Sequence, residues 1–444
     1  MLLYNLRLAW KSVRRYPVLS ALILLGIALG VGVSTTFITA YHVLARDPVP
    51  GKSESLYYVR MNSWGAADDP FLRTRTPPPL ITWRDALELL KSRIPVRGTA
   101  TFGARLTVFP PGGASPLRQR GRLVTTDFFP MFAAPFRYGG PWSREADAQG
   151  ATVTVISSAL NDRLFGGADS VGRTIRVEKA ELRIVGVLAP WRPRVRAYAP
   201  LSDPLAAPEA LFLPLALTAS MEMRPAEMQM DWRNPAPGEE KLPYASRLMI
   251  NEVLFMELWA ELPDAAAVRA YKSFLNAYVA EQKKLGRFPH PADVRVTSLL
   301  DLLDEWKVVP PQTKALAAIS LLFLVVAALN LIGLFLGKFL ARASTVGVRR
   351  ALGASRWMIF AQHLVECELM GLAGGCLGVL LSLAGLAVLN RVYGDGPDGV
   401  PFFQLDLPML LAAVALSLLA GAIAGLYPAW RICAIPPARH LKSQ

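Results

Sequence analysis

The sequence predicts an α-helical membrane protein with four transmembrane helices and a large mixed α/β extracytoplasmic domain between helices 1 and 2. Three observations predict this fold class. The 444 residues are 52% hydrophobic and only 18% charged, their mean hydropathy is +0.31, and four long runs lack Asp, Glu, Lys and Arg. A soluble chain of this size is rarely so apolar, and a disordered chain is more polar and more charged.

The four uncharged runs lie at residues 16–45, 315–337, 369–390 and 407–430. Each is long enough to cross the hydrocarbon core of a bilayer, which takes roughly 20 helical residues. We therefore expect transmembrane helices over residues 18–44, 313–341, 358–390 and 408–431. A cleaved signal peptide is the alternative for the first run, but the run is too long for a signal and no small-residue cleavage site follows it.

Positive charge predicts the orientation of these helices. The segments 1–17, 337–358 and 431–444 contain Lys and Arg but no Asp or Glu. Because such segments favour the cytoplasm, both termini belong inside, and residues 45–312 form a domain on the other side of the membrane. Residues 1–17 form a cytoplasmic amphipathic helix, 342–357 a cytoplasmic loop, 391–407 a short external loop and 432–444 a cytoplasmic tail. Elsewhere bases and acids nearly balance, so no nucleic-acid surface is expected.

The exported domain shows both strand and helix patterns. Strands are expected at residues 152–156, 174–177, 182–188 and 253–262. Asp264 is placed to cap a helix from about Ala265 to Leu285. Proline-rich pieces at 77–79, 189–208 and 234–243 are typical of loops. All three cysteines lie outside this domain, so it folds without disulfides.

Each apolar run contains two glycines four residues apart. The pairs are Gly26 and Gly30, Gly333 and Gly337, Gly371 and Gly375, and Gly421 and Gly425. Glycines at this spacing let membrane helices approach closely, within a compact bundle or at an interface with a second chain. Glu366 lies roughly 15 Å into the third helix. Both a functional role and a hydrogen bond to a neighbouring helix stay open for it, and the hydrogen bond is favoured.

Sequence motifs for catalysis are missing. Gly51-Lys52-Ser53 resembles the end of a phosphate-binding loop, but Arg46 stands where the first glycine is needed. The sequence has no HExxH, no paired CxxC and no GxSxG motif, and its four histidines are scattered. We therefore expect no catalytic, cofactor-binding or metal site in this chain, which is not expected to be an enzyme.

Three segments carry a family resemblance. Residues 25–31 read LGIALGV, residues 347–355 read GVRRALGAS and are followed by Glu366, and residues 425–431 read GLYPAWR and are followed by Pro436 and Leu441. Together they resemble the MacB-like and FtsX-like permeases of ABC transporters, the mechanotransmission type. The exported residues 164–187 also resemble the extracytoplasmic domain of that family.

The resemblance implies a coupling mechanism. A separate ABC ATPase, which holds ATP and Mg, would push the loop 342–357, and the helices would carry the motion outward. The residues that would contact the ATPase are Gly347, Arg349, Arg350, Ala351, Leu352, Gly353 and Ala354. We expect a helix from Thr345 to Arg356 that presents basic and small side chains to the ATPase. A loop that only sets orientation is the alternative, and it explains Arg349 and Arg350 but not the run that follows them.

Two features depart from the family pattern. Thr345 stands where the family has a glutamate, which affects how the loop contacts its ATPase and is consistent with one half of a heterodimer. Only 17 residues precede the first expected transmembrane helix, so the ATPase is expected on a separate polypeptide.

The function expected from these observations is that of an ABC transporter permease subunit. It would drive export or extraction of an amphiphilic substrate such as a peptide, a macrolide-like compound or a lipid-linked molecule. A second permease chain, identical or related, and membrane lipids are expected partners, while a periplasmic adaptor and an outer-membrane channel stay open. The alternative is a non-transporting signal relay that regulates an envelope enzyme or sensor. A membrane-anchored enzyme has no site to support it.

Overall fold

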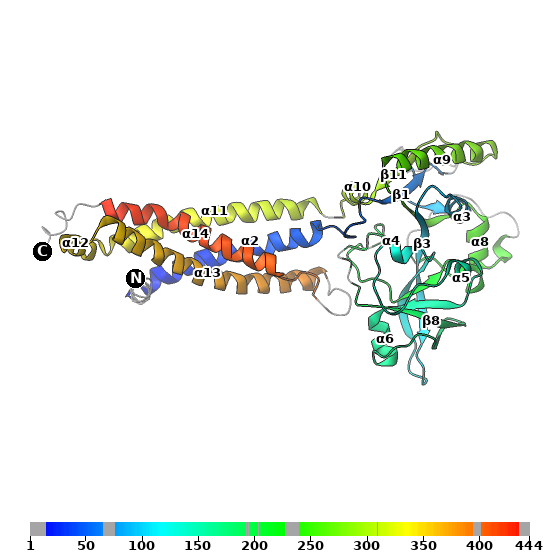
Figure 1. The fold of residues 1–444 in the computed structure, drawn as a ribbon, viewed down its shortest axis with the longest axis horizontal. Helices are drawn as coiled ribbons and strands as arrows, with labels where there is room; N and C mark the ends of the chain where they lie inside the picture. Colours follow the sequence, from blue (N-terminus) through cyan, green and yellow to red (C-terminus); the bar gives the residue numbers. More distant parts are fainter. Residues whose placement is uncertain are drawn as a thin grey trace. The chain divides into compact units, whose positions relative to one another are not determined.

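The computed structural model describes residues 15–64, 76–191, 193, 195–202, 204–226, 239–308, 310–393 and 401–434. The chain forms two compact units, a helical one and a mixed α/β one that spans Asp47–Val308 (Figure 1). The fold class predicted from the sequence is confirmed. Most of the expected amphipathic helix 1–17 and of the tail 432–444, together with part of the loop 391–407, lies outside the described residues.

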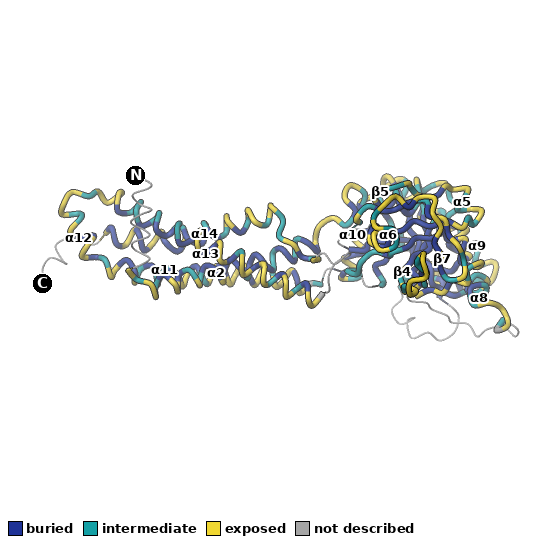
Figure 2. Tube along the Cα trace, turned by 90° about the horizontal axis from the view of Figure 1, so that it is seen from below, coloured by how far each residue is buried: buried dark blue, intermediate teal, exposed yellow. Residues whose placement is uncertain are grey.

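The helical unit contains four long helices. They are α2 (Pro17–Ala45), α11 (Pro311–Leu340), α13 (Arg356–Tyr393) and α14 (Leu407–Ala434). Each is long and apolar enough to cross a membrane. A short helix, α12 (Ala343–Ala351), joins α11 to α13. Helix α2 packs against α11 and α13, and α14 packs against the same two helices. Buried and exposed residues alternate along each long helix (Figure 2), as expected for a bundle.

The α/β unit is built mainly from strands. They are β1 (Leu56–Met61), β2 (Ile81–Thr82), β3 (Arg97–Phe109), β4 (Leu117–Val124), β5 (Phe136–Gly139), β6 (Val153–Ile156), β7 (Thr174–Val177), β8 (Ala180–Leu188), β9 (Leu211–Pro214), β10 (Leu254–Glu261) and β11 (Val294–Ser298). The helical segments are α3 (Trp83–Leu90), α4 (Phe128–Met131), α5 (Arg144–Ala148), α6 (Ser158–Phe165), α7 (Leu217–Ser220), η2 (Glu239–Lys241), α8 (Tyr244–Ile250), α9 (Ala265–Lys284) and α10 (Leu299–Glu305).

The expected strands and helix of this unit are confirmed. Strands β6, β7, β8 and β10 coincide with the four expected strands, and α9 coincides with the expected helix. The Asp264 carboxylate accepts a hydrogen bond from the Ala267 N–H at 2.8 Å. This contact satisfies one of the free amides at the helix start, as an N-cap should.

The strands pair in the order β11-β1-β10-β3-β4-β9-β6-β8-β5. Strand β7 also pairs with both β3 and β8, which closes the circuit β3-β4-β9-β6-β8-β7. The pairs β4–β9 and β6–β8 are parallel, and the other pairs are antiparallel. The longest antiparallel ladder joins β3 and β4 and sets Arg105 opposite Arg120.

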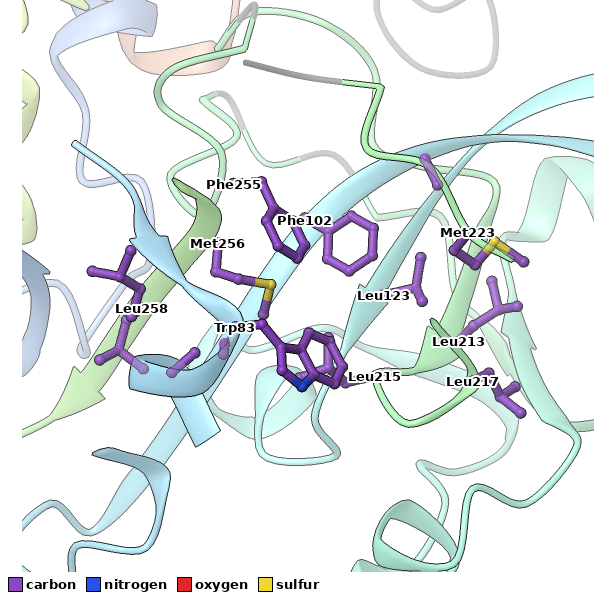
Figure 3. Close-up of a cluster of buried hydrophobic side chains, with 14 of the residues drawn as sticks. Trp83, Phe102, Leu123, Leu213, Leu215, Leu217, Met223, Phe255, Met256 and Leu258 are labelled. Atoms are coloured by element: carbon purple, nitrogen blue, oxygen red, sulfur yellow. The ribbon is translucent and has the colours of Figure 1, made fainter. Parts of the chain in front are cut away.

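Two hydrophobic clusters cover the two faces of the strands. Because side chains alternate along a strand, neighbours such as Leu213 and Phe212 belong to different clusters. Figure 3 shows part of the first cluster, in which Trp83 of α3 stacks on Phe255 and Phe102 packs edge-on against the same Phe255 ring. The second cluster contains Phe212 and many other aromatic rings. The face of the β3–β4 ladder that bears Phe102 and Leu123 therefore packs against the first cluster.

Candidate functional site

The loop that resembles a coupling element is a sharp corner between α12 and α13. Gly353 has a φ of 95°, a left-handed conformation that glycine adopts without strain. The N–H groups of Gly353 and Ala354 donate to the carbonyl oxygens of Arg350 and Arg349 at 3.1 and 3.0 Å. This pair of bonds is a Schellman motif, which ends a helix.

The expected helix from Thr345 to Arg356 is therefore wrong at its C-terminal end. Helix α12 ends at Ala351, because the left-handed Gly353 turns the chain out of the helix. Ser355 then begins the next helix, since its hydroxyl oxygen accepts a hydrogen bond from the Met358 N–H at 3.2 Å. The run from Ala351 to Ser355 thus encodes a helix stop followed at once by a helix start.

The outer side of this corner is apolar. Leu352 is 83% exposed and Trp357 is 74% exposed, and Val348 and Met358 are also exposed large hydrophobic residues. We call these four residues the corner patch. Of the expected contact residues, Ala351, Leu352 and Gly353 are exposed, and Ala354 is half-buried.

Two basic residues of the corner face the bundle, whereas Arg356 is exposed. Arg349 Nη1 donates to Gln362 Oε1 of α13 at 3.0 Å, and Arg350 Nη1 donates to the Cys433 carbonyl oxygen of α14 at 3.2 Å. Gly347 is buried in the same direction. Arg349 and Arg350, which were expected to contact the ATPase, are half-buried and bonded to α13 and α14 in the single chain. Val348 and Leu352, at the end of α12, are four residues apart and lie on its outward face. Arg349 and Arg350 therefore lie on the face that contacts the bundle.

A buried ion cluster lies just before this corner. Lys338 Nζ of α11 is 2.9 Å from Glu366 Oε1 of α13, and the two side chains are 0% and 2% exposed. Arg342 Nη1 is 3.4 Å from the other carboxylate oxygen, Oε2. One carboxylate therefore joins two cations from the end of α11 to α13. Polar contacts between membrane helices contribute about 0.6 kcal/mol on average and up to about 1.7 kcal/mol.

Helix α2 also reaches this end of the bundle. The Tyr16 hydroxyl donates to the Ala341 carbonyl oxygen at 3.3 Å. The Arg342 guanidinium lies 5.4 Å from the centre of the Tyr16 ring, within the range of a cation–π contact. The segment from Lys338 to Arg350 thus has polar contacts with α2, α13 and α14.

The glycine pairs differ in what they touch. A Cβ built on Gly375 would lie 2.5 Å from Ser417 of α14, and one built on Gly425 would lie 2.5 Å from Cys367 of α13. The remaining packed glycines, which also meet another long helix, are Gly26, Gly30, Gly371 and Gly421. A Cβ on Gly333 or Gly337 of α11 would meet no described atom within 4 Å. These two glycines therefore do not pack within the single chain, and the alternative of an interface with a second chain stays a prediction.

Sequence reasoning missed Lys338 and Trp357. Lys338 was grouped with the basic loop, although α11 continues past it to Leu340. Its spacing of four residues from Arg342 was the available signal, because that spacing places both on one helix face. Across the described ranges, no group of three or more His, Cys, Asp or Glu side chains is placed to hold a metal ion.

Two family models match the chain. The MacB-like periplasmic core domain matches residues 20–270, and the FtsX-like permease C-terminal domain matches residues 317–437. The periplasmic region of MacB from Actinobacillus actinomycetemcomitans shares 12% identity at a TM-score of 0.36. That alignment covers 58% of this chain and 94% of the other.

Two curated relatives are longer proteins. The macrolide export ATP-binding/permease protein MacB of Syntrophobacter fumaroxidans is 22% identical over 71% of this chain and 46% of its own length. The pyoverdine export ATP-binding/permease protein PvdT of Pseudomonas aeruginosa is 24% identical over 100% of this chain and 59% of its own length. The chain spans about half the length of these relatives. Since the periplasmic core match alone covers more than half of the residues, the chain belongs to the MacB-like and FtsX-like permeases of ABC transporters.

Proposed function

We propose that this chain couples ATP hydrolysis by a separate ABC ATPase to a conformational change in its extracytoplasmic domain. The change would drive export or extraction of an amphiphilic substrate, such as a peptide, a macrolide-like compound or a lipid-linked molecule. One observation carries the proposal. The α12–α13 corner has an apolar outer side and an inner side that is bonded to the long helices.

The ATPase docks on the corner patch in this proposal. Leu352 stands at the tip of a corner that hydrogen bonds hold in shape, so its position costs little entropy to fix on binding. A cluster of large apolar side chains this exposed favours burial against a partner. ATP and Mg bind on the ATPase, because the 444 residues contain no complete phosphate-binding loop.

The inner contacts give the displacement a route. A push on α12 moves α13 through Arg349 and α14 through Arg350. It moves α11 through the intervening turn, where Glu366 holds the end of α11 against α13. Helices α2 and α11 are the two that continue directly into the exported domain. Motion of these two helices is therefore delivered to that domain along the chain itself.

Orientation and partners complete the proposal. The four apolar helices and the periplasmic core domain are those of an inner-membrane protein. We place both termini in the cytoplasm, because the basic segments and the coupling corner belong on the ATPase side. A periplasmic adaptor and an outer-membrane channel stay open as further partners, since the exported domain is large enough to dock them.

A second permease chain is proposed to pack on α11. Gly333 and Gly337 open onto the outside of the single chain, and in lipid such glycines gain stability only where another helix approaches. The pair Gly333→Leu with Gly337→Leu should weaken dimerisation in nanodiscs, measured by single-molecule photobleaching. Gly375→Leu should instead disrupt the bundle itself. Unchanged dimers in the double variant would contradict this interface.

The coupling proposal is tested with Leu352→Asp. A charged side chain is disfavoured in an apolar cleft of the ATPase. The purified complex should therefore lose the ATPase, or ATP hydrolysis should no longer be stimulated, while the chain remains in the membrane. Ser344→Asp adds the same charge at an exposed position of α12, the helix that precedes Leu352. It serves as the matched control. If Leu352→Asp retains the ATPase and wild-type ATP hydrolysis in nanodiscs, the coupling assignment fails.

The same assay separates a transporter from a signal relay. Addition of erythromycin or an amphiphilic peptide should stimulate ATP hydrolysis if the complex moves such substrates. Stimulation by a purified envelope protein alone would favour the relay.

A further inference from the structure

A row of arginines crosses the outer face of the β3–β4 ladder. Arg118, Arg120 and Arg122 occupy alternate positions of β4 and so project from the same face. Arg105 of β3 lies directly opposite Arg120, and Thr107 lies opposite Arg118. Arg122 is fully buried, whereas Arg105, Arg118 and Arg120 are exposed. The row therefore runs from the interior of the domain to its surface.

The buried end of the row is charge-balanced. Arg122 Nε donates to Glu209 Oε1 at 3.0 Å, and Arg122 Nη1 donates to Glu257 Oε2 at 2.7 Å. Arg196 Nη1 donates to the same Glu209 oxygen at 2.7 Å. The Tyr198 hydroxyl donates to Glu209 Oε2 at 2.8 Å. Two guanidinium groups thus meet two carboxylates, and Glu209 accepts on both of its oxygens.

Glu209 remains ionised in this setting. Burial would raise the pKa of its carboxyl group, but the charges of Arg122 and Arg196 outweigh burial and lower the pKa to about 2. Burial raises the pKa of the Tyr198 hydroxyl, followed by the effect of the Glu209 charge, so the hydroxyl keeps its proton and donates. The negative charge of Glu209 is therefore already neutralised by its arginine partners.

The exposed end of the row lines an open hollow of about 650 Å³. Its wall includes Arg105, Arg118 and Arg120, and its inner end is formed by Ser202 and Glu209. Within the described part of the chain, none of these three arginines has an ion pair or a hydrogen bond to its guanidinium group. An adjoining hollow of about 430 Å³ shares Arg105 but is lined by both acids and bases.

Among the described residues, this arrangement brings like charges together without a counter-charge at their guanidinium groups. Like charges that face each other across an antiparallel pair destabilise a sheet, and Arg105 faces Arg120 in this way. The ladder is rigid, because a packed hydrophobic cluster supports its other face. Guanidinium groups bind carboxylate and phosphate oxygens with paired hydrogen bonds. The volume lies within the range of about 300–1,000 Å³ that is typical of small-molecule sites.

We propose that this hollow binds the phosphate or carboxylate group of an anionic small molecule. Arg105, Arg118 and Arg120 supply the charge, and the neutralised Glu209 network fixes the inner wall. Binding requires neither an ATPase nor transport, so the proposal is independent of the coupling mechanism.

The test uses the full chain in phosphatidylcholine nanodiscs and isothermal titration calorimetry. Inorganic pyrophosphate and citrate are the probes, and a preference for one or the other distinguishes phosphate from carboxylate recognition. We expect saturable binding that weakens with added salt. Arg105→Gln and Arg120→Gln should each lower the affinity by about tenfold or more, because each removes hydrogen bonds to a charged group. Arg269→Gln, at an exposed position of α9, should bind like the wild type.

Thermal unfolding separates a binding role from a structural one. Without anion, the Tm of Arg105→Gln should equal or exceed that of the wild type, because the variant relieves repulsion. With saturating pyrophosphate, the Tm of the wild type should rise and that of the variant should not. No binding of either anion, equal binding by Arg105→Gln, an equal loss in Arg269→Gln, or a lower Tm of Arg105→Gln in both conditions would overturn the proposal.

Discussion

Two buried ion clusters, one in each unit of the molecule, use similar side chains for different ends. In the exported domain, Arg122 and Arg196 meet Glu209 and Glu257, so charges of both signs are equal in number. In the helical unit, Glu366 alone serves Lys338 and Arg342. The first cluster fastens a loop onto one sheet within a single folded domain. The second joins the end of α11 and the following turn to α13 through one shared carboxylate.

The largest effect is expected from Glu209→Gln. The change leaves Arg122 and Arg196 buried with only Glu257 to balance them, and breaking a buried ion pair in this way costs about 3–5 kcal/mol. Urea unfolding of the full chain, followed by the fluorescence of the domain's tryptophans, measures the loss. A loss below about 1 kcal/mol, as for an exposed substitution, would show that the cluster is not a fastener.

A smaller stability loss is expected from Glu366→Gln, with a larger functional one. Between membrane helices the lost contact should cost up to about 2 kcal/mol, because glycine-mediated packing still holds the bundle. ATP-driven activity of the complex should fall, since α11 is no longer held to α13. A double-mutant cycle with Lys338→Met measures the coupling. Additive effects of the two changes would mean that the ion pair plays no part.

Acid should lower the stability of the exported domain as the pH falls from about 4.5 toward 2. The pKa of Glu209 is lowered from 4.5 to about 2 in the folded chain. Its stabilising effect is therefore fully present above about pH 4.5 and is lost as the pH falls toward 2. The Tm of the wild type should fall over this range, and that of Glu209→Gln should fall less. Parallel curves for both proteins would contradict the assignment.

The smallest effect is expected where the same chemistry is exposed. Lys91 and Glu88 of α3 form an ion pair at 2.6 Å, with side chains 70% and 48% exposed. Lys91→Met should change the free energy of unfolding by at most about 1 kcal/mol, because water screens the pair. The same urea titration provides the measurement. A loss as large as that of Glu209→Gln would remove burial as the reason for the difference between the pairs.

The sequence predicted the features that depend on local composition and on the spacing of apolar and capping residues. The uncharged runs predicted the four long helices, and the Asp264 cap predicted the start of α9. The end of α12 was missed because it depends on the left-handed backbone of Gly353. The burial of Arg122 was missed because its partners, Glu209 and Glu257, are far away in the chain.

For the proposed coupling segment, the sequence predicted the position of the loop but not the orientation of its side chains. The motif located the corner, yet nothing in it shows that Arg349 and Arg350 bond to α13 and α14. That contact depends on tertiary packing, which brings Gln362 and the Cys433 carbonyl to the same end of the bundle. The apolar face that remains outside is the part that a partner can reach.

Photo-crosslinking at the corner tests directly whether an ABC ATPase docks on the corner patch. Benzoylphenylalanine would replace Leu352 in one variant and Ser344 in a second, and both would be irradiated in membranes of the native host. We expect a crosslink from position 352 to an ABC ATPase, and its yield should change when ATP is added. The crosslink from position 344 should be much weaker. No ATPase adduct at position 352, or equal adducts at both positions, would contradict docking on the corner patch.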